Sequence, residues 1–135
     1  MAKKGFAHLH VHTEYSMLDG AARLSDLFTH TRELGMDSIA TSDHGFLFGA
    51  FDFWRQAKAN DVKPIIGVEE YLTPGTQRSD RARVRWGDGS RDDVSGGGAY
   101  THMTMWAETT EGMHNLFRAS SIASLEGQLY KPRMD

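Results

Sequence analysis

Apolar positions along the first part of the chain change their spacing, which predicts a strand, a helix and a second strand. Residues 6–11 alternate between polar and apolar and predict a short strand. The helix that follows is expected to begin at Ser25, which can cap it, and to stop at Gly35. Its apolar positions at helical spacing are Leu24, Leu27, Phe28, Thr31 and Leu34. Residues 37–41 predict the second strand.

The same alternation continues through the rest of the chain. Residues 47–59 predict a helix, residues 65–72 a strand opened by Pro64, residues 100–107 a fourth strand and residues 111–125 a last helix. The packing positions expected in the two helices are Phe48, Phe51, Trp54 and Lys58, then Met113, Leu116, Phe117 and Ser120. Strands separated by single helices imply βαβ units, so the predicted fold class is α/β with a parallel sheet, open or closed into a barrel.

Residues 73–99 interrupt this pattern. They contain six glycines, five arginines and four aspartates, with little that is apolar. A connection of this length without periodicity is either a mobile, partly disordered loop or a functional insertion. The functional interpretation is a nucleic-acid or subunit contact through Arg78, Arg81, Arg83 and Arg85 beside Trp86. We favour the solvated loop, because the aspartates dilute the basic patch.

The chain is long enough for one domain, but the predicted strands are too few to close a barrel of about eight strands. Residues 130–135 show no closing element, so we expect the chain to be part of a larger protein. The first residues lack the apolar run of a signal peptide, and no stretch approaches the roughly 18 apolar residues of a membrane span.

Composition narrows the chemistry. The chain has no cysteine, which excludes disulfides and thiolate metal sites within it and suits a cytoplasmic protein. Its formal net charge of −3 gives no overall attraction to nucleic acid. Its seven histidines favour a metal or catalytic site, because histidine is the commonest metal ligand and acts as an acid or base near neutral pH.

The histidines form a pattern in His8-Leu9-His10-Val11-His12. In a strand, residues two apart point to the same side, so neighbouring imidazoles can hold one divalent cation. The alternative is a half-buried strand with solvated histidines, and His8 could hydrogen-bond in the core. Asp19, in the turn signal Asp19-Gly20, gains weight because a carboxylate beside imidazoles offsets the charge of a bound cation.

Other candidates follow the later strands. His44 follows the second strand, and strand ends in a parallel barrel meet at one mouth. Asp43 either orients an imidazole or caps a helix. Glu69 and Glu70 point to opposite sides of the third strand, and the pattern does not choose between them. His102 begins its strand, so its position alone predicts a core or surface histidine.

These residues resemble the motifs of the polymerase and histidinol phosphatase (PHP) domain. Those motifs are a His-x-His pair, an aspartate or histidine, an Asp-His or its equivalent, a Gly-x-Glu and a later histidine. The resemblance favours Glu69 over Glu70 and leaves His8 out. The metal ligands that it implies are His10, His12, Asp19, His44, Glu69 and His102. The catalytic residues that it implies are His10, His12, Asp19, His44 and Glu69.

Longer segments narrow the resemblance to the alpha subunits of bacterial DNA polymerase III. The similar segments are residues 6–20, 42–53, 63–71 and 125–135. The resemblance implies the N-terminal part of a distorted TIM-like (β/α)7 barrel. In that interpretation residues 1–135 are a partial PHP domain that continues beyond Asp135, and residues 73–99 are an inserted loop.

The function implied by the resemblance is phosphodiester hydrolysis, as a 3′–5′ proofreading exonuclease in a replicative DNA polymerase. Up to three divalent ions, zinc, manganese or iron, would bind to the complete domain. Its remaining ligands would follow Asp135, so this chain alone is expected to be inactive. The implied partners are the 3′ end of a DNA primer strand, the rest of the polymerase, the sliding clamp and the clamp loader, with no membrane. The alternatives are a non-catalytic structural domain and a free-standing phosphatase.

Overall fold

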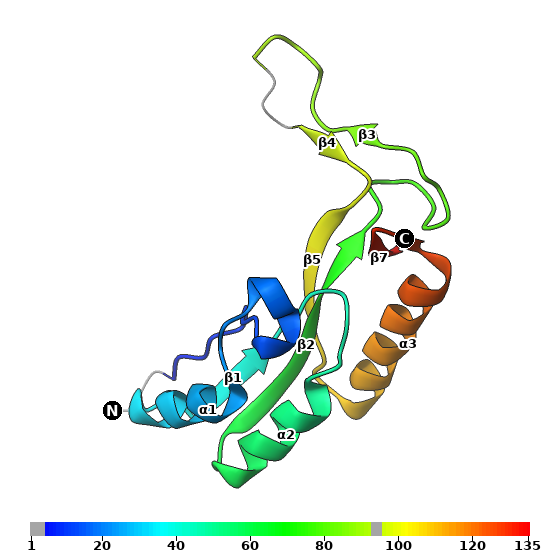
Figure 1. Cartoon of the computed structure of the whole chain (residues 1–135). Helices are drawn as coiled ribbons and strands as arrows, with labels where there is room; N and C mark the ends of the chain where they lie inside the picture. Colours follow the sequence, from blue (N-terminus) through cyan, green and yellow to red (C-terminus); the bar gives the residue numbers. More distant parts are fainter. Residues whose placement is uncertain (1–4, 93–95) are drawn as a thin grey trace.

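Strand β2 (Lys63–Leu72) is the centre of the fold (Figure 1). The computed structural model describes residues 5–92 and 96–135. Strand β1 (Ser38–Thr41) lies parallel to the first half of β2, and β7 (Lys131–Met134) lies parallel to its end. Strand β6 (Gln128–Leu129) extends the sheet antiparallel to β7. The α/β class predicted from the sequence is therefore confirmed.

The expected parallel sheet is formed by β1, β2 and β7, but strand β5 (Thr101–Trp106) runs antiparallel to β2 and departs from that expectation. The reason is local. No helix lies among the described residues between β2 and β5, so the chain returns directly and pairs as in a hairpin. As a consequence, the start of β5 lies beside the end of β2, with His102 opposite Tyr71.

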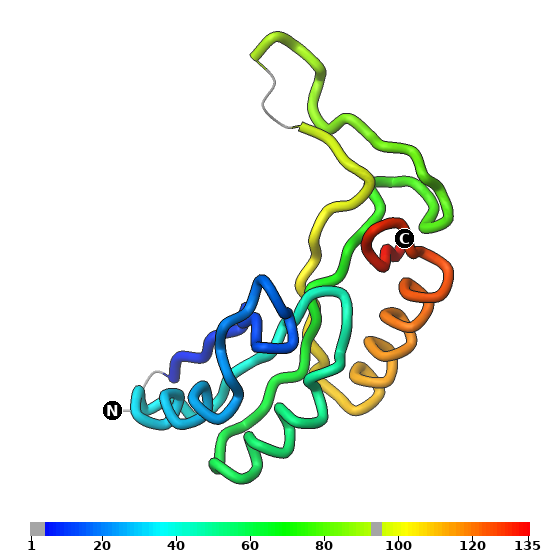
Figure 2. Tube along the Cα trace, in the orientation of Figure 1, coloured from blue at the N-terminus to red at the C-terminus, as the bar shows by residue number. Residues whose placement is uncertain are grey.

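Residues 6–11 do not form the strand that their alternation predicts. They are nevertheless held beside β1, because the Ala40 N–H donates to the His8 carbonyl at 2.9 Å and the Ser42 N–H donates to the Val11 carbonyl at 2.8 Å. The segment then turns into the 3₁₀ helix η1 (Glu14–Asp19). The path of this N-terminal segment, in blue, can be followed in Figure 2.

Helix α2 (Ala50–Ala59) packs against the first half of β2, and helix α1 (Leu24–Glu33) packs against α2. Gly35 follows α1 with φ +72°, which is the expected stop, but Arg23 stands at the N-cap and Ser25 lies inside the helix. The predicted packing stripe of α2 is wrong, because its buried residues are Ala50, Phe53 and Ala57. The residues expected to pack, Phe48, Phe51 and Trp54, are exposed.

The core joins these two helices to the sheet. Phe28 of α1 and Phe53 of α2 are fully buried, and their ring centroids are 4.9 Å apart. The complete cluster is Leu24, Phe28, Ile39, Ala50, Phe53, Ala57, Val62 and Ile66. Each large side chain buried here contributes about 1.5–3 kcal/mol to folding. This packing holds the first half of β2 in place, and the second half of the same strand carries Glu69.

Helix α3 (Thr110–Glu126) packs along the far end of β2 and against β7. Its N-cap is Thr109, whose side chain accepts a hydrogen bond from the Gly112 N–H. Its buried residues are Leu116, Ser120 and Ala123, so the predicted Phe117 contributes less than expected. The hairpin of β6 and β7 follows α3 and contradicts the expectation that residues 130–135 carry no closing element.

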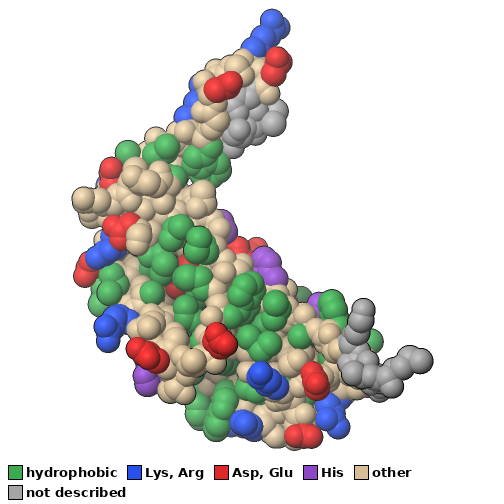
Figure 3. Space-filling model, turned by 180° about the vertical axis from the view of Figure 1, so that it is seen from behind, with side chains coloured by type: hydrophobic (Ala, Val, Ile, Leu, Met, Phe, Trp, Pro, Cys, Tyr) green, Lys and Arg blue, Asp and Glu red, His purple; other side chains and the backbone are tan. Residues whose placement is uncertain are grey.

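Residues 73–99, which we call the arm, project from the body (Figures 1 and 3). The described part of the arm contains the short antiparallel strands β3 (Val84–Arg85) and β4 (Gly97–Gly98), and the choice between a solvated loop and a functional insertion stays a prediction. Both basic and acidic side chains lie on it in Figure 3. Residues 93–95 of the arm, including Val94, and residues 1–4 lie outside the described part of the chain.

Arg133 of β7 ties the base of the arm to the body. Its side chain is 1% exposed. Its guanidinium donates hydrogen bonds to four backbone carbonyls, those of Gly127, Ala99, Arg78 and Asp80.

Within the described residues, no helix is both long and apolar enough to cross a bilayer.

Candidate metal centre

The six predicted ligand residues converge beyond the end of β1 and beside the second half of β2. His44 forms a parallel bridge with Glu69, so the loop after β1 continues along β2. The Gly45 N–H donates to the Glu69 carbonyl at 2.9 Å, and the Glu69 N–H donates to the Asp43 carbonyl at 3.0 Å. These bonds place the His44 and Glu69 side chains at one mouth, as expected for strands that run in the same direction.

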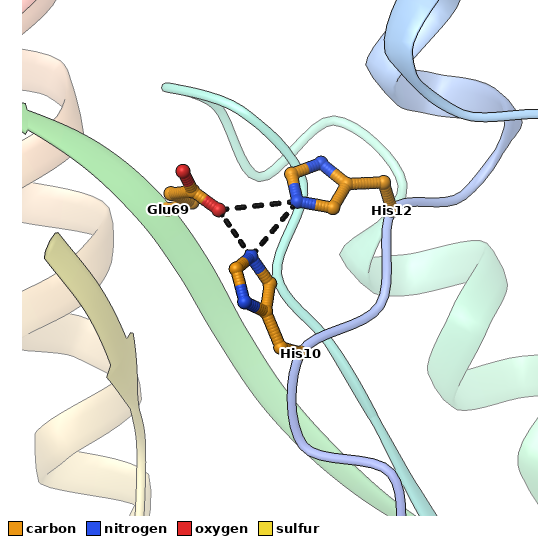
Figure 4. A group of neighbouring side chains, drawn as sticks. All are labelled: His10, His12 and Glu69. Carbon is orange, nitrogen blue, oxygen red and sulfur yellow. Dashed lines mark hydrogen bonds and ion pairs between the residues drawn. The ribbon is translucent and has the colours of Figure 1, made fainter. Parts of the chain in front are cut away.

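His10, His12 and Glu69 form a first group (Figure 4). Both imidazoles come from the N-terminal segment and point towards the carboxylate on β2. His10 Nε2 and His12 Nε2 are 3.0 Å apart, His12 Nε2 is 3.1 Å from Glu69 Oε2, and His10 Nε2 is in contact with the same oxygen. Three potential ligand atoms are thus directed at one small volume.

His44, His102 and Glu69 form a second group. His102 Nδ1 lies 2.6 Å from Glu69 Oε1, and His44 Nδ1 lies 3.8 Å from that oxygen. Glu69 is therefore shared, with Oε2 directed at one pair of histidines and Oε1 at the other. Asp19 joins from η1, where its Oδ2 lies 3.7 Å from His44 Nε2.

A buried polar layer orients His12. Asp43 accepts hydrogen bonds from the Thr13 N–H at 2.6 Å and from the hydroxyls of Thr13, Thr41 and Ser16. Because the Ser16 hydrogen is donated to Asp43, the His12 Nδ1, 3.4 Å from Ser16 Oγ, must carry the proton of that contact. This tautomer leaves the lone pair of His12 Nε2 on the side of Glu69, where it can bind a cation.

Asp43 thus reaches an imidazole through Ser16 and not directly, and it caps no helix. Ser16 could not be selected from the sequence pattern. Its role depends on the fold of η1, which places the Ser16 hydroxyl between Asp43 and His12.

The ring of Tyr71 packs against both histidines of the second group, His44 and His102. Its ring stacks on His44, with centroids 6.0 Å apart and an interplanar angle of 17°, and meets His102 edge-on at 4.9 Å. Gly45 permits this packing. It has φ +68°, and a Cβ at this position would lie 2.8 Å from Tyr71 Cε2 and 2.9 Å from Pro132 Cγ. Only glycine fits both the backbone and the space.

The electrostatics of the cluster favour the ligand forms of its side chains. Burial raises the pKa of Glu69, but hydrogen bonds from His10 and His102 outweigh it and hold that pKa below its usual range. Burial, together with the neighbouring His12, lowers the pKa of His44. A carboxylate and neutral imidazoles are the forms in which these side chains bind metals.

The donor set fits divalent cations. In each group the ligand atoms lie within 4.8 Å of one another. Four imidazole nitrogens with carboxylate oxygens suit zinc, manganese or iron better than magnesium, which prefers oxygen alone. That these residues bind metal stays a prediction, whereas their convergence is a property of the fold.

Two other sequence candidates lie apart from the cluster. His8 is exposed, and its ring meets Phe6 edge-on at 4.8 Å, so it does not hydrogen-bond in the core. Glu70 is fully buried on the opposite side of β2, and neither of its oxygens has a hydrogen-bond partner among the described residues. The alternation along β2 thus separates the two neighbouring carboxylates.

Comparison with solved structures supports the fold. A candidate metal-dependent phosphoesterase from Bifidobacterium adolescentis aligns with a TM-score of 0.54 and 17% sequence identity, over 87% of this chain and 32% of the other. At this identity the likeness concerns the fold alone. It is consistent with the first part of a TIM-like PHP fold.

Comparison with curated proteins gives closer relatives. The chain is 54% identical over 138 residues to the DNA polymerase III subunit alpha of Mycobacterium leprae, and 53% identical over 137 residues to that of Mycobacterium tuberculosis. It is 40% identical over 132 residues to the same subunit of Aquifex aeolicus. The alignments cover at least 98% of this chain but only 12%, 12% and 11% of those proteins. Residues 8–135 match the PHP domain family, and the chain therefore belongs to that family.

Proposed function

We propose that this chain is the PHP segment of a DNA polymerase III alpha subunit, and that its cluster serves phosphodiester hydrolysis at the 3′ end of DNA. The relatives with 53–54% identity over the whole chain support the first part. The second part is supported by the presence of all six residues that the family motifs require.

The shared carboxylate of Glu69 is the observation that carries the proposal. Its two oxygens are directed at two different pairs of histidines. A carboxylate in this position suits a bridge between two cations, and pairs of cations are a common arrangement for phosphoryl transfer. A single structural cation would need only one of the two groups.

The residues that would hold the cations divide accordingly. His10 and His12 with Glu69 Oε2 would hold one, and His44 and His102 with Glu69 Oε1 would hold another, with Asp19 beside His44. Bound cations of this kind lower the pKa of water and neutralise charge that develops on phosphoryl oxygens. The ions could be zinc, manganese or iron.

Neighbouring residues of the chain orient the histidines, and the centre is open to solvent. Ser16 fixes the tautomer of His12, and Tyr71 holds the rings of His44 and His102 in place. The side chain of His10 is more than half exposed, so a DNA terminus can approach from solvent. Asp19 also faces solvent, at the edge of a hollow that begins beside His44.

The larger context follows from the same proposal. Residues 1–135 would be a partial PHP domain with residues 73–99 as an insertion, within a DNA-directed DNA polymerase of the cytoplasm. The rest of the polymerase, the sliding clamp and the clamp loader would be its partners. The relatives are alpha subunits of DNA polymerase III, which supports a role in DNA replication.

The test compares Glu69→Gln with Glu70→Gln in the full-length protein that contains this chain. The two positions are adjacent, yet only Glu69 belongs to the cluster. The assay follows stepwise loss of nucleotides from a single-stranded DNA with a labelled 3′ end, in manganese or zinc. We expect Glu69→Gln to lower the rate at least about 100-fold, because a ligand common to both groups is lost, and Glu70→Gln to retain it.

Primer extension by the same preparations controls for folding. Equal extension by both variants, with 3′ loss abolished only in Glu69→Gln, would support the proposal. If no preparation removes 3′ nucleotides although metal remains bound, the centre is structural and the hydrolytic function fails.

A further inference from the structure

Two hollows on the surface meet at one residue, Tyr130. The first has a volume of about 860 Å³ and runs from the metal centre, where His44 and Asp19 line it, to Tyr130 and Lys131. The second has a volume of about 610 Å³ and runs from Tyr130 to the arm, where Arg81, Arg83 and Trp86 line it. A continuous surface therefore joins the arm to the metal centre.

Two properties of Tyr130, its exposure and its backbone conformation, are typical of a residue that binds a ligand. It is 91% exposed, although the large apolar ring of a tyrosine is usually buried in the protein interior. It occupies the turn between β6 and β7 with φ +60°, a left-handed conformation that tyrosine rarely adopts. Backbone strain of this kind is a common feature of binding sites.

Cations line both hollows at and beyond Tyr130, whereas the acidic residues Glu14 and Asp19 line the first hollow near the metal centre. Arg81 and Arg83 are exposed, and neither has a carboxylate partner among the described residues. Arg78, in contrast, is bound to Glu126 and Asp135 and belongs to the base of the arm. Lys131 lies beside Tyr130, with its Nζ 5.2 Å from the centre of the Tyr71 ring.

Aromatic rings alternating with cations form the pattern that binds single-stranded nucleic acid. Bases stack on exposed rings, while the cations contact the phosphates between them. A duplex would not use this surface well, because its bases are already stacked on one another. The overall charge of −3 gives no general attraction to DNA, so the contact rests on the local cations Arg81, Arg83 and Lys131.

We propose that single-stranded DNA runs from Arg81 and Arg83 across the ring of Tyr130 to the metal centre. One base stacks on Tyr130, and Lys131 contacts the phosphate that follows it towards the 3′ end. Tyr130 is a positioning residue in this arrangement, since it holds the strand and does not touch the reacting atoms. The direction of the strand rests on the proposed hydrolytic function, whereas the contact with Tyr130 does not.

The first experiment is photo-crosslinking, which needs no hydrolysis. The full-length protein is irradiated with a single-stranded oligonucleotide that carries 5-iodo-2′-deoxyuridine near its 3′ end, and crosslinked peptides are identified by mass spectrometry. We expect a crosslink at Tyr130, its loss in Tyr130→Ala and its retention in Tyr130→Phe, which keeps the ring. Crosslinks confined to other surfaces would overturn the proposal.

The second experiment is kinetic. Tyr130→Ala should raise KM for 3′ nucleotide release from an oligonucleotide about tenfold or more, as expected when one stacking contact is lost, with kcat nearly unchanged. Hydrolysis of the p-nitrophenyl ester of thymidine 5′-monophosphate, which is too short to reach the arm, should be unaffected. Tyr130→Phe should restore KM.

The outcomes separate this proposal from the hydrolytic function. A crosslink at Tyr130 in a protein that hydrolyses nothing supports the DNA path and defeats the nuclease. Hydrolysis that Tyr130→Ala leaves unchanged in both KM and kcat, without a crosslink, overturns the path and leaves the nuclease standing. Binding of another protein at Tyr130 in place of DNA would appear as this second outcome.

Discussion

Glu69 and Glu70 are neighbours with opposite environments. Glu69 lies among four histidines, and Glu70 lies in the interior near Ser120 without a hydrogen-bond partner. The Ser120 hydroxyl cannot help Glu70 much, since its hydrogen is donated to the Gly45 carbonyl. Burial therefore raises the pKa of Glu70 to about 7.

A raised pKa in the folded state determines how Glu70 affects stability. Below the pH at which an unfolded glutamate ionises, both states are protonated and folding is not penalised. As the pH rises towards 7, the unfolded state loses its proton first and stability falls. Above 7 the loss is complete, and it amounts to roughly 3 kcal/mol for a shift of this size.

Glu70→Gln should remove this pH dependence, because the amide has no charge to bury. We expect the variant and the wild type to differ little at pH 5, and the variant to be more stable at pH 8. The measurement is hydrogen exchange of the amides of β2 and α3 in the full-length protein, with both proteins compared at each pH. Equal protection at pH 8 would contradict the assignment.

Single residues of the site were predictable from the sequence to different degrees. The alternation in residues 8–12 indicated a metal pair, although the segment is not a regular strand. Alternation alone could not choose Glu69, because the pattern does not tell which face of β2 meets the histidines. Ser16 was not predictable, since its role depends on a hydroxyl placed by tertiary contacts.

At the scale of elements, the direction of β5 explains the position of His102. A parallel β5 would have carried His102 to the opposite end of the sheet. Because β5 is antiparallel to β2, its first residues lie at the mouth. The sequence alone does not reveal this direction, since the arm has no periodicity. The buried face of α2 could not be predicted from its large apolar residues, because two of its three buried residues are the small Ala50 and Ala57.

The loop between β1 and α2 depends on Gly45, and Gly35 offers a matched control. Both have positive φ, but a Cβ at Gly35 would meet nothing within 4 Å, whereas at Gly45 it would collide with Tyr71 and Pro132. Gly35→Ala should cost about 1 kcal/mol from backbone strain alone. Gly45→Ala should cost roughly 2–4 kcal/mol, because overpacking adds to that strain.

Thermal unfolding and metal titration of the two variants check this prediction. We expect Gly45→Ala to weaken metal binding as well, because Tyr71 supports His44 and His102. If both variants bind metal equally well and unfold at the same temperature, the packing at Gly45 has no such role.

On the scale of the whole molecule, Arg133 joins the arm to the body. Its guanidinium satisfies four carbonyls at once, two of them in the first part of the arm. Lysine has only three donors and lacks the planar fork, so Arg133→Lys leaves at least one buried carbonyl unpaired. Such a carbonyl costs about 1–3 kcal/mol.

We expect thermolysin to cleave the arm of Arg133→Lys roughly tenfold faster than that of the wild type, because the base of the arm opens more often. Arg118→Lys, on the exposed face of α3, is the control and should not change the rate. Equal cleavage in all three proteins would show that the arm is held by other contacts.

The most direct test of the metal centre is the electron paramagnetic resonance spectrum of the manganese-loaded full-length protein. If Glu69 bridges two cations, the wild type and Glu70→Gln should show the multiline signal of an exchange-coupled pair, and Glu69→Gln should show only isolated ions or none. An unchanged coupled signal in Glu69→Gln, or isolated ions in the wild type, would contradict a shared carboxylate between the two histidine pairs.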